Sequence, residues 1–354
     1  MNALKIKDRI IGPGNRTFVI AEIGVNHDGS LSRALELVEM ARSAGADAVK
    51  LQIFQAAKLL NPAAGFAGYQ RDRVVDAEPA QMLRRYELPA LDLAHIIAAI
   101  GKAEMIPLAT PFSISDVDAI GALALPAIKI ASPDLINYPL LQAAAKLDQP
   151  LMISSGAASM EDVLQATTWL EQWDASYALL HCISSYPVPA DSAHLSWIAQ
   201  LAEAFDVPVG YSDHTTEVLS GALAVAAGAC IVERHLTHDR QADGPDHSSS
   251  SGPDEFAEYV RLIRHAETMF GHGGKRVLSI EEDVRIASRQ SLVAAKDLPA
   301  GHPITQHDLI VQRPGTGILA SEYENLIGRQ TSCNVAAGTV LQAHMIAGYL
   351  SNAA

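Results

Sequence analysis

The chain contains the stretch Gly210-Tyr-Ser-Asp-His-Thr215, then a small-residue helical pattern, and then Val232-Glu-Arg-His235. Each of the two segments ends a short apolar run with a histidine. In a barrel of alternating strands and helices, the carboxyl ends of the strands gather at one mouth, where enzymes of this architecture do their chemistry. Two neutral imidazoles that converge there are typical ligands of a divalent transition metal. The two segments therefore predict a barrel with a metal-assisted site.

Apolar runs that suit strands alternate with amphipathic helical patterns along most of the chain. The strand candidates are Phe18–Ile23, Ala48–Ile53, Ile106–Thr110, Ala127–Ile130, Leu151–Ser154, Tyr177–His181, Pro208–Tyr211 and Ala229–His235. The clearest helical patterns are Leu31–Ala44, Leu91–Ala103, Met160–Trp173, Val218–Ala227 and Glu255–Phe270. Such alternation favours a (β/α)8 TIM barrel over the alternative, a doubly wound open sheet. No GxGxxG or P-loop motif follows any of these runs, which weakens the open-sheet alternative.

The chain is expected to have three parts: a catalytic barrel over residues 1–275, a linker over 276–287 and a small β-rich domain over 288–354. The interval from Gln55 to Ala90 is long for a strand-to-helix connection and predicts a flap beside the active site. The last part has short strand-like runs, little helix and turns such as Leu298-Pro-Ala-Gly301. A β-rich module of that size is marginally stable alone, so we expect it to pack on something else.

Composition excludes several classes of partner. The net charge of −14 argues against nucleic acid. The longest apolar stretch, Val218–Val232, is shorter than the 18 or more residues expected of a membrane span. The three cysteines, Cys182, Cys230 and Cys333, form no CxxC pair. No basic-then-apolar leader opens the chain. We expect a cytoplasmic protein with neither nucleic acid nor membrane as a partner.

Polar side chains end or follow nearly every predicted strand. Two pairs, Lys50 with Gln52 and Glu233 with His235, are two residues apart and so share one face of a strand. A lone histidine at a strand end is more often structural, and loop serines are usually turn formers. The joint pattern favours function, because stability alone does not require polar groups at every strand end. The full set is Glu22, Lys50, Gln52, Thr110, Lys129, Ser132, Ser154, Ser184, Tyr186, Ser212, His214, Glu233 and His235.

Part of this set suits a phosphate or a phosphorylated carboxylate. Lys50 and Lys129 lie in apolar runs, where an unpaired ammonium is costly to bury and a functional role is favoured. Lysine supplies compact positive charge, and the hydroxyls of Thr110, Ser132 and Ser154 supply directional hydrogen bonds. An acidic chain needs such local cations to bind an anion.

The remaining polar residues suit a second, uncharged substrate. His214 and His235 suit Mn²⁺, Zn²⁺ or a similar ion with open positions for a carbonyl and water. Glu22 and Glu233 suit orienting a sugar hydroxyl or taking a proton. The residues alone thus predict a metal-assisted reaction that joins a phosphate-bearing acid to a polar carbonyl compound.

The chain resembles the sialic acid synthases in motifs that occur in order along nearly its whole length. The tail is similar to the SAF (antifreeze-like) domain of that family. The matching segments are Ala21-Glu-Ile-Gly-Val-Asn-His-Asp-Gly29, Gly45-Ala-Asp-Ala-Val-Lys-Leu-Gln52, Thr110-Pro-Phe112, Lys129-Ile-Ala-Ser132, His181-Cys-Ile-Ser-Ser-Tyr-Pro187, Gly210-Tyr-Ser-Asp-His-Thr215, Val232-Glu-Arg-His235, Gly244-Pro-Asp-His247 and, in the tail, Arg313-Pro-Gly-Thr-Gly-Ile318.

The resemblance implies condensation of phosphoenolpyruvate with an N-acetylated hexosamine to give a nine-carbon 2-keto-3-deoxy acid and phosphate. It implies that His214 and His235 hold a divalent metal, Mn²⁺ first, with Mg²⁺ or Co²⁺ as alternatives, and that Glu22 is the acid/base. The implied phosphoenolpyruvate contacts are Lys50, Thr110, Lys129, Ser132, Ser154 and Ser184. The implied sugar contacts are Gln52, Tyr186, Ser212, Glu233, Asp246 and Arg313, the last donated by the partner subunit of a domain-swapped homodimer.

Several alternatives stay open. The acceptor is N-acetylmannosamine or 2,4-diacetamido-2,4,6-trideoxymannose, since the segment Ser184-Ser-Tyr-Pro187 lacks the Asn that N-acetylneuraminate synthases often carry there. A Schiff-base pyruvate aldolase would use Lys129 as its nucleophile. A phosphoenolpyruvate-dependent synthase could act on another sugar or a sugar phosphate. The chain could also be a non-catalytic carbohydrate-binding protein, or its tail an ice- or glycan-binding module.

Overall fold

The computed structural model describes residues 3–61, 63–65, 78–271 and 273–350. The chain divides into two compact units, Met1–His272 and Gly273–Ala354. Residues 276–287, expected to be a linker, belong to the second unit and include most of helix α12 (Glu282–Ser288).

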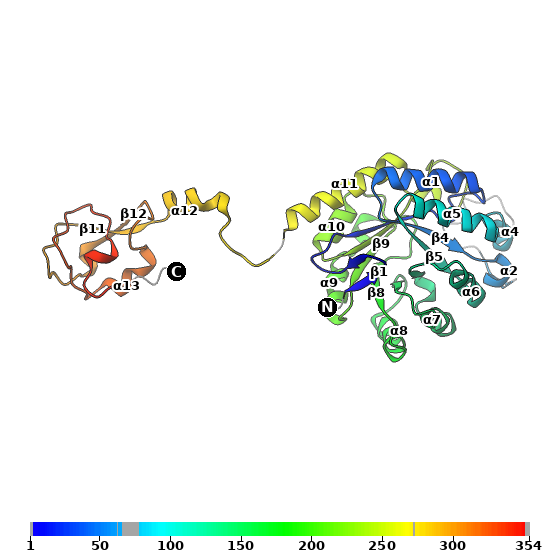
Figure 1. Ribbon diagram of the computed structural model, residues 1–354, viewed down its shortest axis with the longest axis horizontal. Coiled ribbons are helices and arrows are strands. Elements are labelled where there is room, and N and C mark those ends of the chain that lie inside the picture. The colour runs from blue at the N-terminus through cyan, green and yellow to red at the C-terminus, as the bar shows by residue number, and fades with distance from the viewer. Residues whose placement is uncertain (1–2, 62, 66–77, 272, 351–354) are drawn as a thin grey trace. The chain divides into compact units, whose positions relative to one another are not determined.

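The first unit is a closed barrel of parallel strands (Figure 1), as the sequence predicted. Its last strand pairs with its first, His235 opposite Glu22, which excludes the doubly wound open sheet. Around the barrel the order is β10-β3-β4-β5-β6-β7-β8-β9. The strands are β3 (Phe18–Glu22), β4 (Ala48–Ile53), β5 (Ile106–Pro111), β6 (Ile128–Ile130), β7 (Leu151–Ser154), β8 (Tyr177–Cys182), β9 (Val209–Asp213) and β10 (Ile231–His235).

Helices cover the outside of the barrel (Figure 1). Their ends follow local sequence signals: Ser30 accepts a hydrogen bond from the Arg33 amide and begins α1, and left-handed Gly45 ends it. Ser159 and Asp162 form a capping box on α8. The helices are α1 (Leu31–Ala44), α5 (Ala90–Lys102), α6 (Ile114–Ala122), α7 (Tyr138–Ala145), α8 (Met160–Gln172), α9 (Ser196–Ala204), α10 (Ser220–Ala226) and α11 (Pro253–Phe270).

Two features were not predicted from the sequence. A hairpin of β1 (Leu4–Ile6) and β2 (Arg9–Ile11) precedes the barrel, and its apolar side chains join the core at the amino end of the strands. The described part of the interval expected to be a flap contains two short helices, α2 (Ala56–Leu59) and α4 (Pro79–Arg84). Residues 62 and 66–77 of that interval lie outside the described residues.

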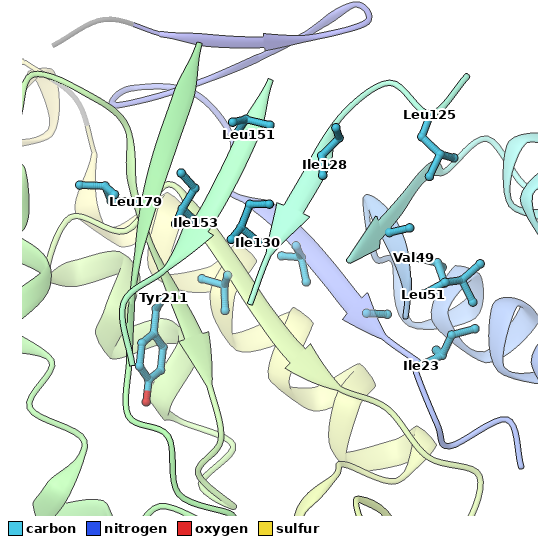
Figure 2. Packing of buried hydrophobic residues seen from close by; sticks show 14 of the residues in the cluster. Ile23, Val49, Leu51, Leu125, Ile128, Ile130, Leu151, Ile153, Leu179 and Tyr211 are labelled. Atoms are coloured by element: carbon cyan, nitrogen blue, oxygen red, sulfur yellow. The ribbon is translucent and has the colours of Figure 1, made fainter. Parts of the chain in front are cut away.

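Strand alternation sorts the barrel side chains into two sets. Outward residues such as Val49, Leu51 and Ile153 pack under the helices in one large apolar cluster (Figure 2). Inward residues at the amino end of the strands, among them Phe18 and Met152, fill the barrel floor. Because apolar side chains fill the floor, the inward positions at the carboxyl ends remain for polar groups.

The second unit is small and β-rich, as expected. Strand β11 (Ser291–Ala294) pairs antiparallel with β12 (Leu309–Gln312), and isolated bridges join several further segments. A short helix, α13 (Tyr323–Leu326), contributes Leu326 to its separate apolar core. In neither unit does a described helix have the length and apolar character needed to cross a membrane.

Candidate active site

A cavity of about 380 Å³ lies at the carboxyl ends of the barrel strands. Among the residues expected at the site, it brings together all those of the first unit except Glu22. Those that line it are Lys50, Gln52, Thr110, Lys129, Ser132, Ser154, Ser184, Tyr186, Ser212, His214, Glu233, His235 and Asp246.

Glu22 and Arg313 are the two other residues expected at the site. The Glu22 side chain is fully buried beneath the cavity, where Oε1 accepts a hydrogen bond from Gln52 Nε2 at 2.9 Å. Its Oε2 lies 2.6 Å from Lys50 Nζ. Arg313 is an exposed residue of the second unit. Glu22 is therefore joined to the cavity through its neighbours Gln52 and Lys50.

Two buried lysines form the cationic side of the pocket. Lys50 Nζ donates to Thr110 Oγ1 at 3.1 Å, and Lys129 Nζ donates to Ser154 Oγ at 2.6 Å. Burial lowers the pKa of Lys129 below its usual value, against the opposing effect of Glu233. Burial also opposes protonation of Lys50, but Glu22 and Glu233 outweigh it and raise that pKa. Two ammonium groups beside hydroxyls suit an anionic ligand.

A glycine allows three small side chains to approach one another beside Lys129. The amide of Gly156 donates to Ser132 Oγ at 2.9 Å. A Cβ at this position would collide with Ser184 Oγ and would lie 2.8 Å from Ser132 Oγ and 2.9 Å from Cys182 Sγ. Sequence reasoning missed Gly156, although it follows Ser154 in the motif Ser154-Ser-Gly156. The hydroxyls of Ser132 and Ser184 thus form a hydroxyl cradle around Gly156, and only glycine fits at this position.

Three carboxylates at or next to the cavity, Glu22, Asp246 and Glu233, differ in the direction of their pKa shifts. Burial raises the pKa of Glu22, although Lys50 opposes the rise. Burial, aided by Glu22, raises the pKa of Asp246 to about 6. Burial acts the same way on Glu233, but there Lys129 and Lys50 outweigh it and lower the pKa. Carboxylates whose pKa values are pushed apart are the arrangement that acid/base chemistry uses.

The two histidines converge on one wall of the cavity. Their ring centroids are 5.6 Å apart, and the Tyr186 ring lies 4.1 Å from that of His214. His214 Nδ1 lies 2.9 Å from the Ile183 carbonyl oxygen, so this nitrogen carries a proton and leaves Nε2 for a ligand. Burial opposes charge on His214, but Cys182 and the Ile183 carbonyl raise its pKa to about 9.

The pKa of His235 shifts in the opposite direction to that of His214. Burial, with His214 as the next cause, holds its pKa well below the usual value. Its buried Nδ1 has no hydrogen-bond partner and lies 3.6 Å from Asp246 Oδ2. Across the described part of the chain, no group of three or more His, Cys, Asp or Glu side chains is placed to hold a metal. A buried imidazole nitrogen without a partner fits a two-histidine site that takes its other ligands from substrate and water.

An apolar wall also borders the cavity, and sequence reasoning did not include it. Val25, Met82, Leu83 and Phe112 line this side, with the Phe112 ring edge-on to Phe54 at 6.1 Å. Phe112 belongs to the motif Thr110-Pro-Phe112, and that motif is the signal that could have identified it. Met82 and Leu83 come from α4, whose six residues matched none of the motifs.

Comparisons with known proteins cover nearly the whole chain. Residues 37–275 match the NeuB family, and residues 289–347 match the SAF domain. The chain is 38% identical to N,N'-diacetyllegionaminic acid synthase of Legionella pneumophila, over 93% of this chain and 94% of that one. Identity to the enzyme of the same name from Campylobacter jejuni is 36%, over 90% and 97%.

A solved structure agrees in both fold and sequence. It is that of the N-acetylneuraminic acid (sialic acid) synthetase of Leptospira borgpetersenii in complex with citrate. The TM-score is 0.72 and the identity 30%, with 80% of this chain and 95% of that chain covered.

Proposed function

The chain belongs to the NeuB family and carries a SAF domain, and from this premise we propose that it condenses phosphoenolpyruvate with an N-acetylated hexosamine. The products would be a nine-carbon 2-keto-3-deoxy acid and phosphate, which makes the enzyme a transferase. One observation carries the proposal: a single cavity holds two lysines with neighbouring hydroxyls, a histidine pair and two carboxylates. We call Lys50, Lys129 and the hydroxyls beside them the cationic cradle. The cradle suits the phosphorylated acid, and the histidine pair suits the sugar.

Our proposed acceptor is 2,4-diacetamido-2,4,6-trideoxymannose, in preference to N-acetylmannosamine. The two relatives named as N,N'-diacetyllegionaminic acid synthases, at 38% and 36% identity, support this choice. The cavity lining offers no lysine or arginine besides Lys50 and Lys129 among the described residues. Since one phosphate already needs those two cations, a free sugar is favoured over a sugar phosphate.

Phosphoenolpyruvate would lie over the two lysines. Lys50 and Thr110 are hydrogen-bonded on one side, and Lys129 and Ser154 on the other. The hydroxyls of Ser132 and Ser184 flank Gly156 and would complete the anion's hydrogen bonds. Ammonium groups fixed in place before the reaction stabilise the charge that develops on the departing phosphate.

The proposed reaction balances with one water. C3 of phosphoenolpyruvate bonds to the aldehyde carbon of the sugar, water oxygen adds to C2, and the C2–O bond to phosphate breaks. One proton of the water ends on the former aldehyde oxygen and the other on phosphate. Glu22 and Asp246, whose pKa values are raised, would accept and return these protons.

His214 and His235 would hold a divalent cation, Mn²⁺ in our proposal, with Mg²⁺ or Co²⁺ as substitutes. When bound, such a cation polarises a carbonyl oxygen as a Lewis acid. The sugar itself would contact Gln52, Tyr186, Ser212 and Glu233. The support for this side is the convergence of the two rings and the unpartnered Nδ1 of His235.

Arg313 would donate to the N-acetyl group of the sugar from the partner subunit of a domain-swapped homodimer. This part of the proposal rests on the SAF-domain match and on the exposed guanidinium of Arg313. A charged donor to an amide carbonyl would select acceptors that carry the acetamido group.

Phosphate release from phosphoenolpyruvate tests the proposal. The assay compares the two acceptor sugars, each with Mn²⁺ and with a chelator. We expect chelator-sensitive release with the diacetamido sugar and slower release with N-acetylmannosamine. No release with either sugar would contradict the proposal.

A Schiff-base pyruvate aldolase is the second candidate, and the lowered pKa of Lys129 favours it. A lowered pKa makes the neutral amine, the form that attacks a carbonyl, more available. Borohydride trapping of pyruvate on Lys129, read by mass spectrometry, would support the aldolase. Absence of the adduct together with chelator-sensitive phosphate release would exclude it.

A further inference from the structure

The residues next to the two histidines point out of the barrel and meet each other. On β9 and just after it, Ser212 and His214 line the cavity, so the side chain of Asp213 between them faces the helices. On β10, Glu233 and His235 line the cavity, and Arg234 faces out. Neither Asp213 nor Arg234 has a part in the proposed chemistry.

Asp213 and Arg234 form a buried ion pair. They are register partners between β9 and β10, and Arg234 Nη1 lies 3.0 Å from Asp213 Oδ2. Only 1% of Asp213 and 3% of Arg234 is exposed. The Arg234 guanidinium also lies over the Tyr259 ring, 4.4 Å from its centroid.

Further hydrogen bonds complete a cluster that we call the outer polar cluster: Asp213, Ser220, Arg234, Ser251 and Tyr259. Tyr259 Oη donates to Asp213 Oδ2 at 2.8 Å, and Ser220 Oγ donates to the same oxygen at 2.5 Å. Arg234 donates from Nε to Ser251 Oγ at 2.6 Å. A buried ion pair contributes little net stability compared with apolar packing, so its value is more often the geometry that it specifies.

The outer polar cluster holds the backbone on both sides of each histidine. Asp213 Oδ1 accepts from the Thr215 amide at 2.8 Å, which closes a tight turn around His214. The Ser251 amide donates to the His235 carbonyl at 2.9 Å, and Arg234 holds the Ser251 side chain. One ion pair thereby connects the backbone of His214 to that of His235.

We propose that Asp213 and Arg234 are positioning residues that set the relative placement of His214 and His235 for metal binding. The inference rests on the metal role given to those histidines under Proposed function. Neither residue would touch substrate. Groups that orient metal ligands in this way change metal affinity by about 10–100-fold when they are removed.

The full-length variant Asp213→Asn tests the inference, because the amide keeps the shape and loses the charge. The double variant Asp213→Asn/Arg234→Met removes both charges and leaves no unpaired one buried. The matched control is Asp47→Asn. Asp47 is a partly buried residue that also pairs with an arginine, 2.6 Å from Arg264 Nη2, and it accepts from the Val19 amide at the amino end of the barrel.

The readouts are Mn²⁺ affinity, by electron paramagnetic resonance titration, and urea unfolding. We expect Asp213→Asn and the double variant to bind Mn²⁺ about 10-fold or more weakly. Asp47→Asn should lose stability and keep the wild-type affinity. Wild-type affinity in Asp213→Asn and in the double variant would overturn the positioning role, as would an equal loss of affinity in Asp47→Asn.

His235→Ala separates this inference from the proposed function. If His235→Ala loses Mn²⁺ binding while both cluster variants keep it, only the positioning role is wrong. If His235→Ala binds Mn²⁺ like the wild type, the metal assignment fails and the inference fails with it. The phosphate-release assay judges the overall reaction independently of both results.

Discussion

Lys50 and Glu22 are opposite each other on β4 and β3, with Nζ 2.6 Å from Oε2 in a pair that is almost wholly buried. The same ammonium donates to Thr110 in the proposed anion site. A protein carboxylate and a substrate carboxylate or phosphate therefore compete for one cation. A substitution that ends this competition should therefore change substrate affinity and turnover in opposite directions.

The substitution Glu22→Gln should strengthen phosphoenolpyruvate binding and weaken catalysis. It frees Lys50 from its carboxylate partner, and it removes a group proposed to move protons, a role worth about 10²–10⁴-fold in rate. Isothermal titration calorimetry with phosphoenolpyruvate and the phosphate-release rate measure the two effects. The exposed Glu203→Gln on α9 is the control. Weaker phosphoenolpyruvate binding by Glu22→Gln would contradict the competition.

Gly156→Ala should impair anion binding through sterics alone. The added Cβ would lie 2.8 Å from Ser132 Oγ and would collide with Ser184 Oγ, so the hydroxyl cradle must open. We expect the KM for phosphoenolpyruvate to rise about 10-fold or more, the loss of one or two hydrogen bonds to a charged ligand. Gly101→Ala on α5 is the control, because a Cβ added there would meet no atom within 4 Å. A wild-type KM in Gly156→Ala would show that the cradle is not an anion site.

His235→Ala should abolish chelator-sensitive turnover and leave the fold intact. The imidazole makes no hydrogen bond through Nδ1, so its removal breaks no structural contact at that atom. Circular dichroism checks the fold, and phosphate release in metal-stripped buffer, then with added Mn²⁺, checks the activity. Full activity of the variant without metal would refute the proposed role.

The second unit should lose stability at low pH through Asp308. Burial opposes its ionisation, but Lys296, His302 and Thr305 hold the pKa of this carboxyl well below its usual value. A depressed folded pKa stabilises the fold above the unfolded value of about 4, and that contribution is lost as the pH falls through the folded value. Asp308→Asn should therefore reduce protection in β11 at pH 7, and the difference from wild type should shrink below about pH 4.

Hydrogen-exchange mass spectrometry of β11 peptides, corrected for intrinsic exchange rates, measures this effect. The control is Glu324→Gln, an exposed carboxylate of the same unit. An Asp308→Asn deficit that stays constant from neutral to low pH would contradict the electrostatic origin.

Truncation at Gly274 should abolish sugar turnover while the barrel stays folded. The barrel strands, their helices and the pocket residues all precede this position, and the proposed sugar contact Arg313 follows it. Phosphoenolpyruvate affinity and circular dichroism should match the full chain within about two-fold, whereas phosphate release should vanish. A truncated chain with full activity would refute the role proposed for the SAF domain.

The barrel could be predicted because the sequence itself shows how side chains alternate along each strand and how many strand candidates there are. Lys50 and Gln52 are two residues apart and do line one cavity, as that period requires. The same period implies outer positions for Asp213 and Arg234, but it cannot name their partners, which come from α10, α11 and the segment after β10. Tertiary packing decides such contacts.

Other features had too little local signal. Strands β1 and β2 have three residues each, too short for a period to emerge. Met82 and Leu83 reach the cavity from α4, a helix of six residues that is too short for a helical period to point to them. The backbone role of Gly156 depends on three side chains from separate strands and loops, so only their approach in space reveals it.

The pairing of β10 with β3 has a consequence for how the enzyme is made. It places His235 opposite Glu22, so the pocket joins the first strand of the barrel to the last. A chain emerging from the ribosome can form most of its helices and every strand pair from β3 to β9, yet it has no complete pocket until β10 has emerged. The pocket is therefore completed at the end of barrel folding, and recovery of phosphoenolpyruvate binding after dilution from denaturant measures the closing of the barrel.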